Sequence, residues 1–399
     1  MSKLLTLKDI DVTNKRVFLR VDYNVVADGK IIDEFRVRAS LPTINYLLEQ
    51  NCSIILASHN GRPDGKVVES LSLRPVAKLL PRLLGRDVIF LDDCVGEDVR
   101  KEAEYLRAGD IMLLENLRFH PEEEKNDSTF ASQLADLAEV YVDDAFAAIH
   151  RAHASTVGVA QLLPHAAGRL VQKEYETIEM LMHKPKRPYT AVIGGAKISD
   201  KIEVLVELLK HVDALLIGGA MANTFLAALG TNMRSSKLEK SSFADAKKII
   251  SLAKKNKVRL VLPSDVVVAK EAKANHHGRV VEIDKLKAGD MALDIGPATM
   301  EMFDAVLQDS KTIFWNGTLG IAELPVFAVA SRDLAHAMIS SHAQTIVGGG
   351  DTAAFVDQQN LAEHFGFVST GGGASLELLA GKKLPGLEIL KTRALKISA

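Results

Sequence analysis

The sequence predicts an α/β protein made of two doubly wound parallel-sheet domains joined by a hinge helix. Three observations lead to this prediction. The chain has 399 residues, which is too long for one ordinary core. Short apolar runs alternate with helix-patterned segments in both halves, and glycine-rich turns follow several of those runs.

The composition is that of a globular protein of a reducing compartment. Apolar residues make up 47% of the chain and charged residues 25%, and the net charge of −2 gives no footprint for nucleic acid. Cys52 and Cys94 lie in different contexts, without metal-ligand spacing. No run approaches the roughly 18 apolar residues of a membrane span, and the first residues lack a signal-peptide core. We expect a cytoplasmic protein without nucleic-acid or membrane partners.

The strands expected in the first half are the runs RVFLRVDYNVV, CSIILASH, DVIFLD, DIMLLENLRF and AEVYVDDAF. Those in the second half are YTAVIGGA, ALLIGGA, VRLVLPSDVVVA, KTIFWNG and TIVGGG. Segments such as RVRASLPTINYLLEQN and FADAKKIISLAKKN return an apolar residue every three or four positions and predict helices. One parallel sheet per half follows, with ligands beyond the carboxyl ends of its strands.

The expected boundary is the segment LVQKEYETIEMLMHKPKRP, residues 170–188. It predicts a helix that ends before Pro185, with cations at its carboxyl end. A helix between two domains is a plausible hinge, although an ordinary surface helix explains the pattern equally well. The expected division is residues 1–170 with a tail of about 386–399, the hinge segment 171–188, and residues 189–385.

The first half concentrates polar and cationic residues at the ends of its predicted strands. Arg20, Asp22 and Asn24 are two residues apart, which would place them on one strand face; an edge strand with a wet face is the alternative. Further cations and histidines stand near other strand ends or helix starts: Arg36, His59, Arg62, Arg118, His150, Arg151 and His153. Converging on one sheet edge, they would receive phosphate and carboxylate groups. Taken singly, each arginine is more simply an ordinary surface residue.

The second half has glycine where the first has arginine. In VIGGAKISDK, the spacing predicts that Lys197 and Lys201 share a helix face near its amino terminus, where polyphosphate would offset their charge; two solvated lysines are the alternative. LLIGGAMANTF, WNGTLGIAE, GGGDTAA and STGGGAS add further turns after strands. Glycine lets a backbone approach a ligand closely, and helix-start amides attract anions. Together these turns predict a nucleotide site.

Asp351 stands directly after the turn GGG and before Thr352. An acidic residue beside a phosphate turn fits a role in holding Mg²⁺ on nucleotide phosphates. The alternative is that Asp351 caps the helix that begins there.

Read in order, these motifs resemble those of the phosphoglycerate kinase family: RVDYNV, HNGRP, LLENLRF, HRAHAST, GGAKISDK, LLIGGAMANTF, WNG, GGGDTAA and TGGGAS. The resemblance implies two Rossmann-like domains. It also implies a reversible, Mg²⁺-dependent phosphoryl transfer between 1,3-bisphosphoglycerate and ADP, giving 3-phosphoglycerate and ATP in glycolysis. A monomer is the expectation from the family, and the carboxyl-terminal tail would return to the first domain.

The resemblance also implies roles for single residues. Phosphoglycerate would contact Arg20, Asp22, Asn24, Arg36, His59, Asn60, Gly61, Arg62, Arg118 and Arg151. The nucleotide would contact Gly195, Lys197, Lys201, Gly219, Asn316, Gly320, Glu323, Gly349, Gly350, Asp351 and Thr352, with Asp351 on the metal and Glu323 on the ribose. Catalysis would rest on Arg36, Lys197, Gly372 and Gly373, and Gly371 would offer a further amide to the moving phosphoryl group.

The chain departs from the family pattern at Val26, Thr318, the stretch AAIH, the stretch GIAE and the tail GLEILKTRALKISA. None of these replaces a residue with an expected role. Two other hypotheses stay open at this point. A nicotinamide-dependent dehydrogenase would need Gly-x-Gly-x-x-Gly after a strand, a spacing that these turns do not have. A catalytically inactive nucleotide-binding protein of the same fold would be favoured by loss of Arg36, Lys197 or Asp351, and all three are present.

Overall fold

The computed structural model describes residues 3–274 and 278–392. Contacts between residues divide the chain into two compact units, one holding the residues up to Thr177 and those from Lys383 onward, the other Ile178–Lys382. Each unit contains one six-stranded parallel sheet with helices on both faces, which confirms the predicted fold class. No helix in the described ranges combines the length and apolarity needed to cross a membrane.

The sheet of the first unit has the strand order β5-β6-β4-β1-β7-β8. Its strands are β1 (Arg16–Arg20), β4 (Ser53–Ala57), β5 (Ile89–Phe90), β6 (Ile111–Leu113), β7 (Val140–Asp143) and β8 (His165–Ala167). β1 therefore lies in the middle of the sheet, so the edge-strand alternative is wrong. It also ends at Arg20, and Asp22 and Asn24 lie in the loop beyond it rather than on the strand face that the spacing predicted.

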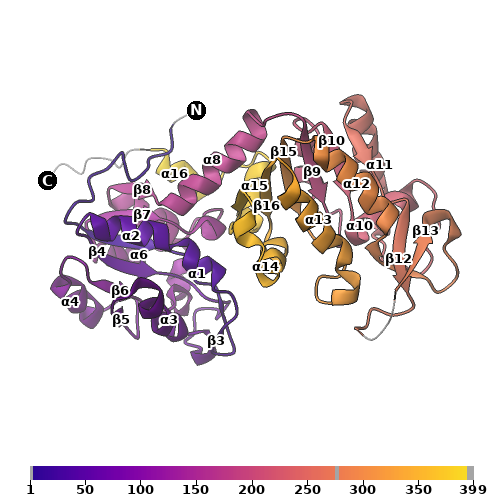
Figure 1. The fold of residues 1–399 in the computed structure, drawn as a ribbon. Helices are drawn as coiled ribbons and strands as arrows, with labels where there is room; N and C mark the ends of the chain where they lie inside the picture. Colours follow the sequence, from indigo (N-terminus) through magenta and orange to yellow (C-terminus); the bar gives the residue numbers. More distant parts are fainter. Residues whose placement is uncertain (1–2, 275–277, 393–399) are drawn as a thin grey trace. The chain divides into compact units, whose positions relative to one another are not determined.

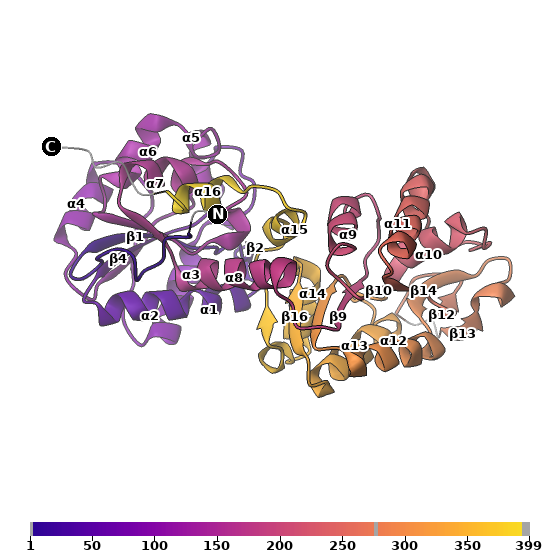
Figure 2. The ribbon, with the colours of Figure 1, turned by 90° about the horizontal axis from the view of Figure 1, so that it is seen from above.

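The helices of the first unit connect these strands and cover both faces of the sheet. They are α1 (Phe35–Ala39), α2 (Leu41–Glu49), α3 (Arg74–Leu84), α4 (Glu97–Tyr105), α5 (Pro121–Glu124), α6 (Ser128–Ala135) and α7 (Val159–Leu162). Figure 2 shows α1 and α2 on one side of the sheet and α5 to α7 on the other. The helix predicted between the halves is α8 (Arg169–His183), which ends before Pro185 as expected.

The parallel sheet of the second unit has the order β11-β10-β9-β15-β16-β17. Its strands are β9 (Tyr189–Ile193), β10 (Ala214–Ile217), β11 (Arg259–Val261), β15 (Thr312–Asn316), β16 (Gln344–Gly348) and β17 (Phe367–Val368). The helices around it are α9 (Ile202–Leu208), α10 (Gly219–Ala228), α11 (Phe243–Lys255), α12 (Pro297–Asp309), α13 (Val329–Ser340), α14 (Gly350–Gln358) and α15 (Gly373–Leu379). Asn316 on β15 is level with Ile193 on β9 and Gly348 on β16, so three strands end side by side.

The expectation of one sheet per half is incomplete. The second unit also contains an antiparallel sheet of β13 (Arg279–Glu282), β12 (Asp265–Ala269) and β14 (Met291–Ile295). The first unit adds the small pair β2 (Val26–Ala27) and β3 (Lys30–Ile31). The sequence predicts one strand for the run VRLVLPSDVVVA, but Pro263 lacks the N–H that a ladder needs and divides the run into β11 and β12.

The described part of the carboxyl-terminal segment packs on the first unit. It forms α16 (Pro385–Leu390), where the N–H of Gly386 donates to the carbonyl of Ile149 at 2.9 Å. The carbonyl of Leu390 accepts the N–H of Leu5 at 2.9 Å. The rest of the predicted tail, 393–399, lies outside the described residues.

Candidate active site

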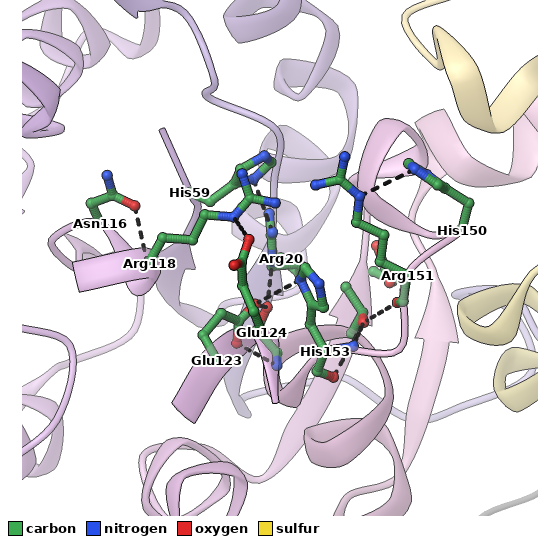
Figure 3. A network of polar contacts seen from close by, with 12 residues as sticks. Arg20, His59, Asn116, Arg118, Glu123, Glu124, His150, Arg151 and His153 are labelled. Atoms are coloured by element: carbon green, nitrogen blue, oxygen red, sulfur yellow. Dashed lines mark hydrogen bonds and ion pairs between the residues drawn. The ribbon is translucent and has the colours of Figure 1, made fainter. Parts of the chain in front are cut away.

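The basic cluster of the first unit lies at the end of β1 and beyond the carboxyl ends of β4, β6 and β7. Figure 3 shows its side chains. We use this name for Arg20, His59, Arg118, Arg151 and His153. Arg20 is 1% exposed, and its Nη2 lies 3.1 Å from His59 Nδ1. Its Nε donates to Ser155 Oγ at 2.8 Å. The side chain at the end of the central strand is therefore fixed from two directions.

Two loops bring the other cations to the cluster. The side chain of Asn116 accepts the N–H of Arg118 at 3.1 Å at the start of a 3₁₀ turn, Leu117–Phe119. Arg118 Nη1 then donates to the carbonyl of Gly61 at 2.8 Å, and its Nε lies 3.0 Å from Glu124 Oε1. Arg151 is partly exposed, and its Nε donates to His150 Nε2 at 3.2 Å.

The electrostatics of the cluster favour an anion. Burial, with the charges of Arg20, Arg118 and Arg151, holds the pKa of His59 well below its usual range and lowers the pKa of His153 to about 3. Both imidazoles are therefore neutral near pH 7, and the contact of 3.7 Å between His153 and Glu123 is not an ion pair. Burial also lowers the pKa of Arg118 to about 10, which leaves it charged. Such partly desolvated guanidinium groups bind phosphate and carboxylate strongly.

The remaining expected residues of the first unit lie in helix α1 and in the loops that follow β1 and β4. Arg36, 21% exposed, pairs with Asp22 through Nη1 and Oδ2 at 2.8 Å. Asn24 Oδ1 accepts the N–H of Gly61 at 2.9 Å, where Gly61 has a φ of 62°. Arg62 is exposed.

Asn60 differs from these residues because its side chain bonds the protein backbone and has a structural role. It is fully buried, and its Oδ1 and Nδ2 bond the backbone N–H and carbonyl of Val26 at 3.1 and 3.0 Å. This amide therefore positions the loop that carries Asp22 and Asn24.

In the second unit a cavity of about 460 Å³ opens among the glycine turns. Five of the residues expected at the nucleotide line it: Gly195, Gly219, Gly320, Glu323 and Asp351. Glycine is required at Gly320, because a Cβ there would lie 2.1 Å from the carbonyl oxygen of Phe327 and 2.4 Å from Asp294 Oδ1. The floor is apolar and includes Leu293, Ile295 and Leu319, which suits the flat face of a base.

The prediction that Lys197 and Lys201 share a helix face is wrong. Helix α9 begins at Ile202, and both lysines lie in the turn before it. Glu239 holds that turn open by accepting the N–H groups of Ile198 and Ser199 at 2.8 and 3.1 Å. Lys197 is exposed, whereas Lys201 turns inward.

Lys201 lies between the ends of two adjacent strands. Its Nζ donates to the carbonyls of Gly194 at 2.9 Å and Asn316 at 3.2 Å. Burial lowers the pKa of Lys201 to about 8, although Asp351 and Asp200 act in the opposite direction. The ammonium group of Lys201 therefore loses its proton more readily than that of an exposed lysine, and it lies beside the glycine turns.

The turn that carries Asp351 begins with Gly349, which has a φ of 91° and stands before α14. Asp351 is exposed in the first turn of that helix, whose N-cap is Gly349, and among the described residues it makes no capping hydrogen bond, so the capping alternative is wrong. Thr352 is fully buried, and its Oγ1 accepts the N–H of Gly317 at 2.7 Å. Asn316 is also buried, and its Nδ2 donates to the carbonyl of Gly348 at 2.8 Å. Asn316 and Thr352 therefore shape the turns.

The last glycine turn leaves its backbone accessible. Gly372, with a φ of 52°, stands before α15, which begins at Gly373. A Cβ added to either residue would meet nothing within 4 Å. The space beside both residues is thus free of other described atoms on the Cβ side.

Sequence reasoning missed several residues of both sites. Buried Glu123 and Ser155 support the basic cluster, while Asn223, Lys237 and Asp294 line the cavity. Asn223 stood inside a quoted motif, LLIGGAMANTF. Ser155 likewise stood inside HRAHAST. Glu123, Lys237 and Asp294 gave no signal, because their roles depend on contacts between segments far apart in the chain.

One group of potential metal ligands lies in the first unit, and hydrogen bonds between its members account for its arrangement. Within the described ranges, Asp93, Cys94 and His120 are the one set of three potential ligands whose ligand atoms lie within 4.8 Å of one another. Asp93 Oδ1 already accepts the N–H of Cys94 at 2.6 Å and lies 2.7 Å from His120 Nε2. Burial also raises the pKa of the Cys94 thiol well above its usual value, which disfavours the thiolate that a metal would bind.

Comparison with known proteins identifies the family. The sequence model described as "Phosphoglycerate kinase" matches residues 7–382. The chain belongs to the phosphoglycerate kinase family. The phosphoglycerate kinase of Moorella thermoacetica is 52% identical over 387 residues, which is 97% of this chain and 98% of the relative. That of Pelotomaculum thermopropionicum is 48% identical over 386 residues, 96% of this chain and 98% of the relative.

Solved phosphoglycerate kinases share the fold. The structure from Coxiella burnetii has a TM-score of 0.86 and 39% identity, covering 97% of this chain and 99% of its own. The structure from Pyrococcus horikoshii has a TM-score of 0.81 and 30% identity, covering 97% and 98%. The chain is thus a phosphotransferase with phosphoglycerate kinase function in glycolysis, using ATP and ADP. The dehydrogenase hypothesis is wrong, and nothing favours the inactive one.

Proposed function

We propose that the basic cluster of the first unit binds 3-phosphoglycerate or 1,3-bisphosphoglycerate and that the glycine turns of the second unit bind the nucleotide. The observation that carries this proposal is the division of chemistry between the units. The first gathers three guanidinium groups around neutral imidazoles, and the second surrounds an apolar cavity with glycine turns. Arg20, Arg118 and Arg151 suit the two anionic ends of a phosphoglycerate, whereas a base and polyphosphate suit the cavity and turns.

We assign the contacts at the reacting group to residues that the structure leaves accessible. Arg36 and Lys197 would neutralise charge on the transferring phosphoryl group, and the amides of Gly372 and Gly373 would donate to its oxygens. Phosphoryl transfer depends mainly on positioning and charge stabilisation. In the direction that forms 1,3-bisphosphoglycerate the nucleophile is a carboxylate, already ionised at neutral pH, so the chain needs no general base.

Asp351 fits a role in holding Mg²⁺. Its carboxylate is exposed in the first turn of α14 and lines the cavity. Mg²⁺ in kinases is held by one or two carboxylates together with substrate phosphates, so a single acidic side chain is sufficient. When bound with the nucleotide, the ion would neutralise charge on the phosphate oxygens.

We further propose that the two units are the two domains and that residues 171–188 act as their hinge. The residues assigned to the two substrates belong to different units, and in-line transfer requires the substrates to meet in a water-excluding site. Small-angle scattering with both substrates bound should show compaction; an unchanged radius of gyration would contradict this hinge. A cytoplasmic monomer is the accompanying expectation, from the family's place in glycolysis.

Arg36→Ala tests the site assignment. We expect kcat to fall by about 10²–10³, as for loss of a group that stabilises transition-state charge. Formation of 1,3-bisphosphoglycerate from Mg-ATP and 3-phosphoglycerate is followed through NADH oxidation by glyceraldehyde-3-phosphate dehydrogenase. Arg38→Ala is a matched control, because Arg38 is 57% exposed on the same helix and pairs only with Glu34 among the described contacts. Equal activity in wild type and Arg36→Ala would refute the assignment.

A further inference from the structure

Glu123 is a buried carboxylate beneath the basic cluster, and its side chain is fully shielded from solvent. It lies in α5, the short helix that begins with Pro121. Its Oε1 accepts the hydroxyl of Ser155 at 2.6 Å, and its Oε2 accepts the N–H of the same residue at 2.9 Å. Figure 3 shows it within the network that also holds Arg20 and His153. Neither contact reaches a surface where substrate could bind.

The two bonds to Ser155 determine what its hydroxyl can do. A serine hydroxyl has one hydrogen and two lone pairs, and Glu123 takes the hydrogen. The lone pairs remain for Arg20, whose Nε donates to Ser155 Oγ at 2.8 Å. A guanidinium group has donors only, so it needs acceptors in fixed places. Glu123 therefore orients Ser155, and Ser155 orients Arg20.

Arg20 in turn contacts His59 of the basic cluster and the backbone of Val21. Its Nη2 contacts His59 Nδ1 at 3.1 Å, and its Nη1 donates to the carbonyl of Val21. The charge of Glu123 also matters, because burial raises its pKa while Arg20, Ser155 and Arg118 act to lower it. The neighbouring guanidinium groups thus counteract the effect of burial on the Glu123 carboxylate.

We infer that Glu123 is a positioning residue for phosphoglycerate binding, acting through Ser155 on Arg20. The inference rests on the proposed function of the basic cluster and deepens it. Because a buried polar chain is effective only when every member is satisfied, loss of either link removes the contact that fixes Arg20 Nε and leaves Arg20 held only through its Nη1 and Nη2 atoms. Glu123 makes no contact with substrate in this scheme.

The test compares Glu123→Gln and Ser155→Ala with wild type. Glutamine offers one oxygen to two donors of Ser155, and alanine removes the acceptor of Arg20. We expect each variant to raise the KM for 3-phosphoglycerate about tenfold, with kcat less affected and the KM for Mg-ATP unchanged. The double variant should be no worse than the worse single variant, since both break one chain. Glu122→Gln is the matched control on the same helix, with no contact to Ser155 among the described residues.

Other roles give other results. If Glu123 acted only through its charge, its removal would make the cluster more positive, lowering both the KM for 3-phosphoglycerate and the inhibition constant of sulfate; that result overturns the inference. Equal increases in both KM values, or additive effects in the double variant, overturn it as well. Should Glu123→Gln fold poorly, Ser155→Ala alone decides, because an unchanged KM there breaks the proposed chain.

Failure of the proposed function looks different. Arg36→Ala would then leave activity unchanged, whatever the two other variants do. If Arg36→Ala lowers kcat as expected and neither Glu123→Gln nor Ser155→Ala alters the KM for 3-phosphoglycerate, only the positioning role is refuted.

Discussion

Lys201 should take up a proton when the nucleotide binds. Its ammonium group is partly buried against the carbonyls of Gly194 and Asn316, and its pKa is lowered to about 8. Near pH 8, therefore, about half of the free protein carries a neutral lysine. Nucleotide phosphates bring negative charge beside the group and raise its pKa again.

The size of the effect follows from the lowering of the pKa from 10.5 to about 8. One pKa unit corresponds to about 1.4 kcal/mol. If nucleotide binding returns the pKa of Lys201 to its ordinary value, the nucleotide binds the protonated form more tightly than the neutral form by on the order of 3 kcal/mol. Binding at pH 8 should take up about 0.5 proton, and at pH 7 about 0.1. The affinity for the nucleotide should weaken by up to tenfold for each pH unit above 8, because there Lys201 is protonated in the bound protein but neutral in the free protein.

Calorimetry of Mg-ADP binding in buffers of different ionisation enthalpy measures this uptake directly. Lys201→Met removes the titrating group while keeping an unbranched side chain, so the uptake at pH 8 should disappear. Lys210→Met is the control, since Lys210 is 57% exposed and pairs with Glu207 in the same unit. The reasoning is refuted if wild type takes up no proton at pH 8, or if Lys201→Met takes up as much as wild type.

Two further predictions concern stability and nucleotide binding. Asp144 directly follows β7, and its Oδ1 accepts the N–H of Leu170 at 2.8 Å at the start of α8. Burial raises the pKa of Asp144 to about 7, so its contribution to stability is favourable at low pH and is lost as pH rises through 7. Asp144→Asn should flatten this dependence and stabilise the protein at pH 8 by up to roughly 4 kcal/mol, measured by thermal unfolding between pH 5 and 8; a variant less stable at pH 8 would contradict this sign. Gly194→Ala would place a Cβ 2.2 Å from the carbonyl oxygen of Thr318, separating the ends of β9 and β15. We expect at least tenfold weaker Mg-ADP binding with an unchanged affinity for 3-phosphoglycerate, and equal nucleotide affinity would show that the turn tolerates the change.

The sequence allowed the parallel sheets to be predicted because they depend on local patterns. Apolar runs such as YTAVI and TIFWN are bounded by glycine or asparagine, and the helices between them repeat every three or four residues. The antiparallel sheet was missed because β12 belongs to the same apolar run as β11 and because β13 has no clear strand pattern. Arg279–Glu282 is largely exposed and carries no continuous apolar run.

The site divides in the same way. Arg20, Arg118 and Asp351 could be predicted, since charged residues next to strand ends or glycine turns are visible in the sequence. Glu123 could not be predicted, because its role depends on a hydrogen bond with Ser155, which is 32 residues away in the chain. The misplacement of Lys197 and Lys201 has a similar cause, because Glu239, 40 residues further along than Ser199, keeps their turn from joining the helix.

The return of the chain to the first unit has a consequence for protein synthesis. Leu5 near the start bonds Leu390 near the end, and His165 Nε2 lies 2.8 Å from the carbonyl of Thr392. Ribosomes make Leu390 and Thr392 only after residues 178–382, so the first unit cannot complete its contacts until the second unit has been synthesised. The second unit, Ile178–Lys382, is continuous and can close its contacts earlier. A premature stop near residue 384 would therefore damage the unit that was translated first and spare the one translated last.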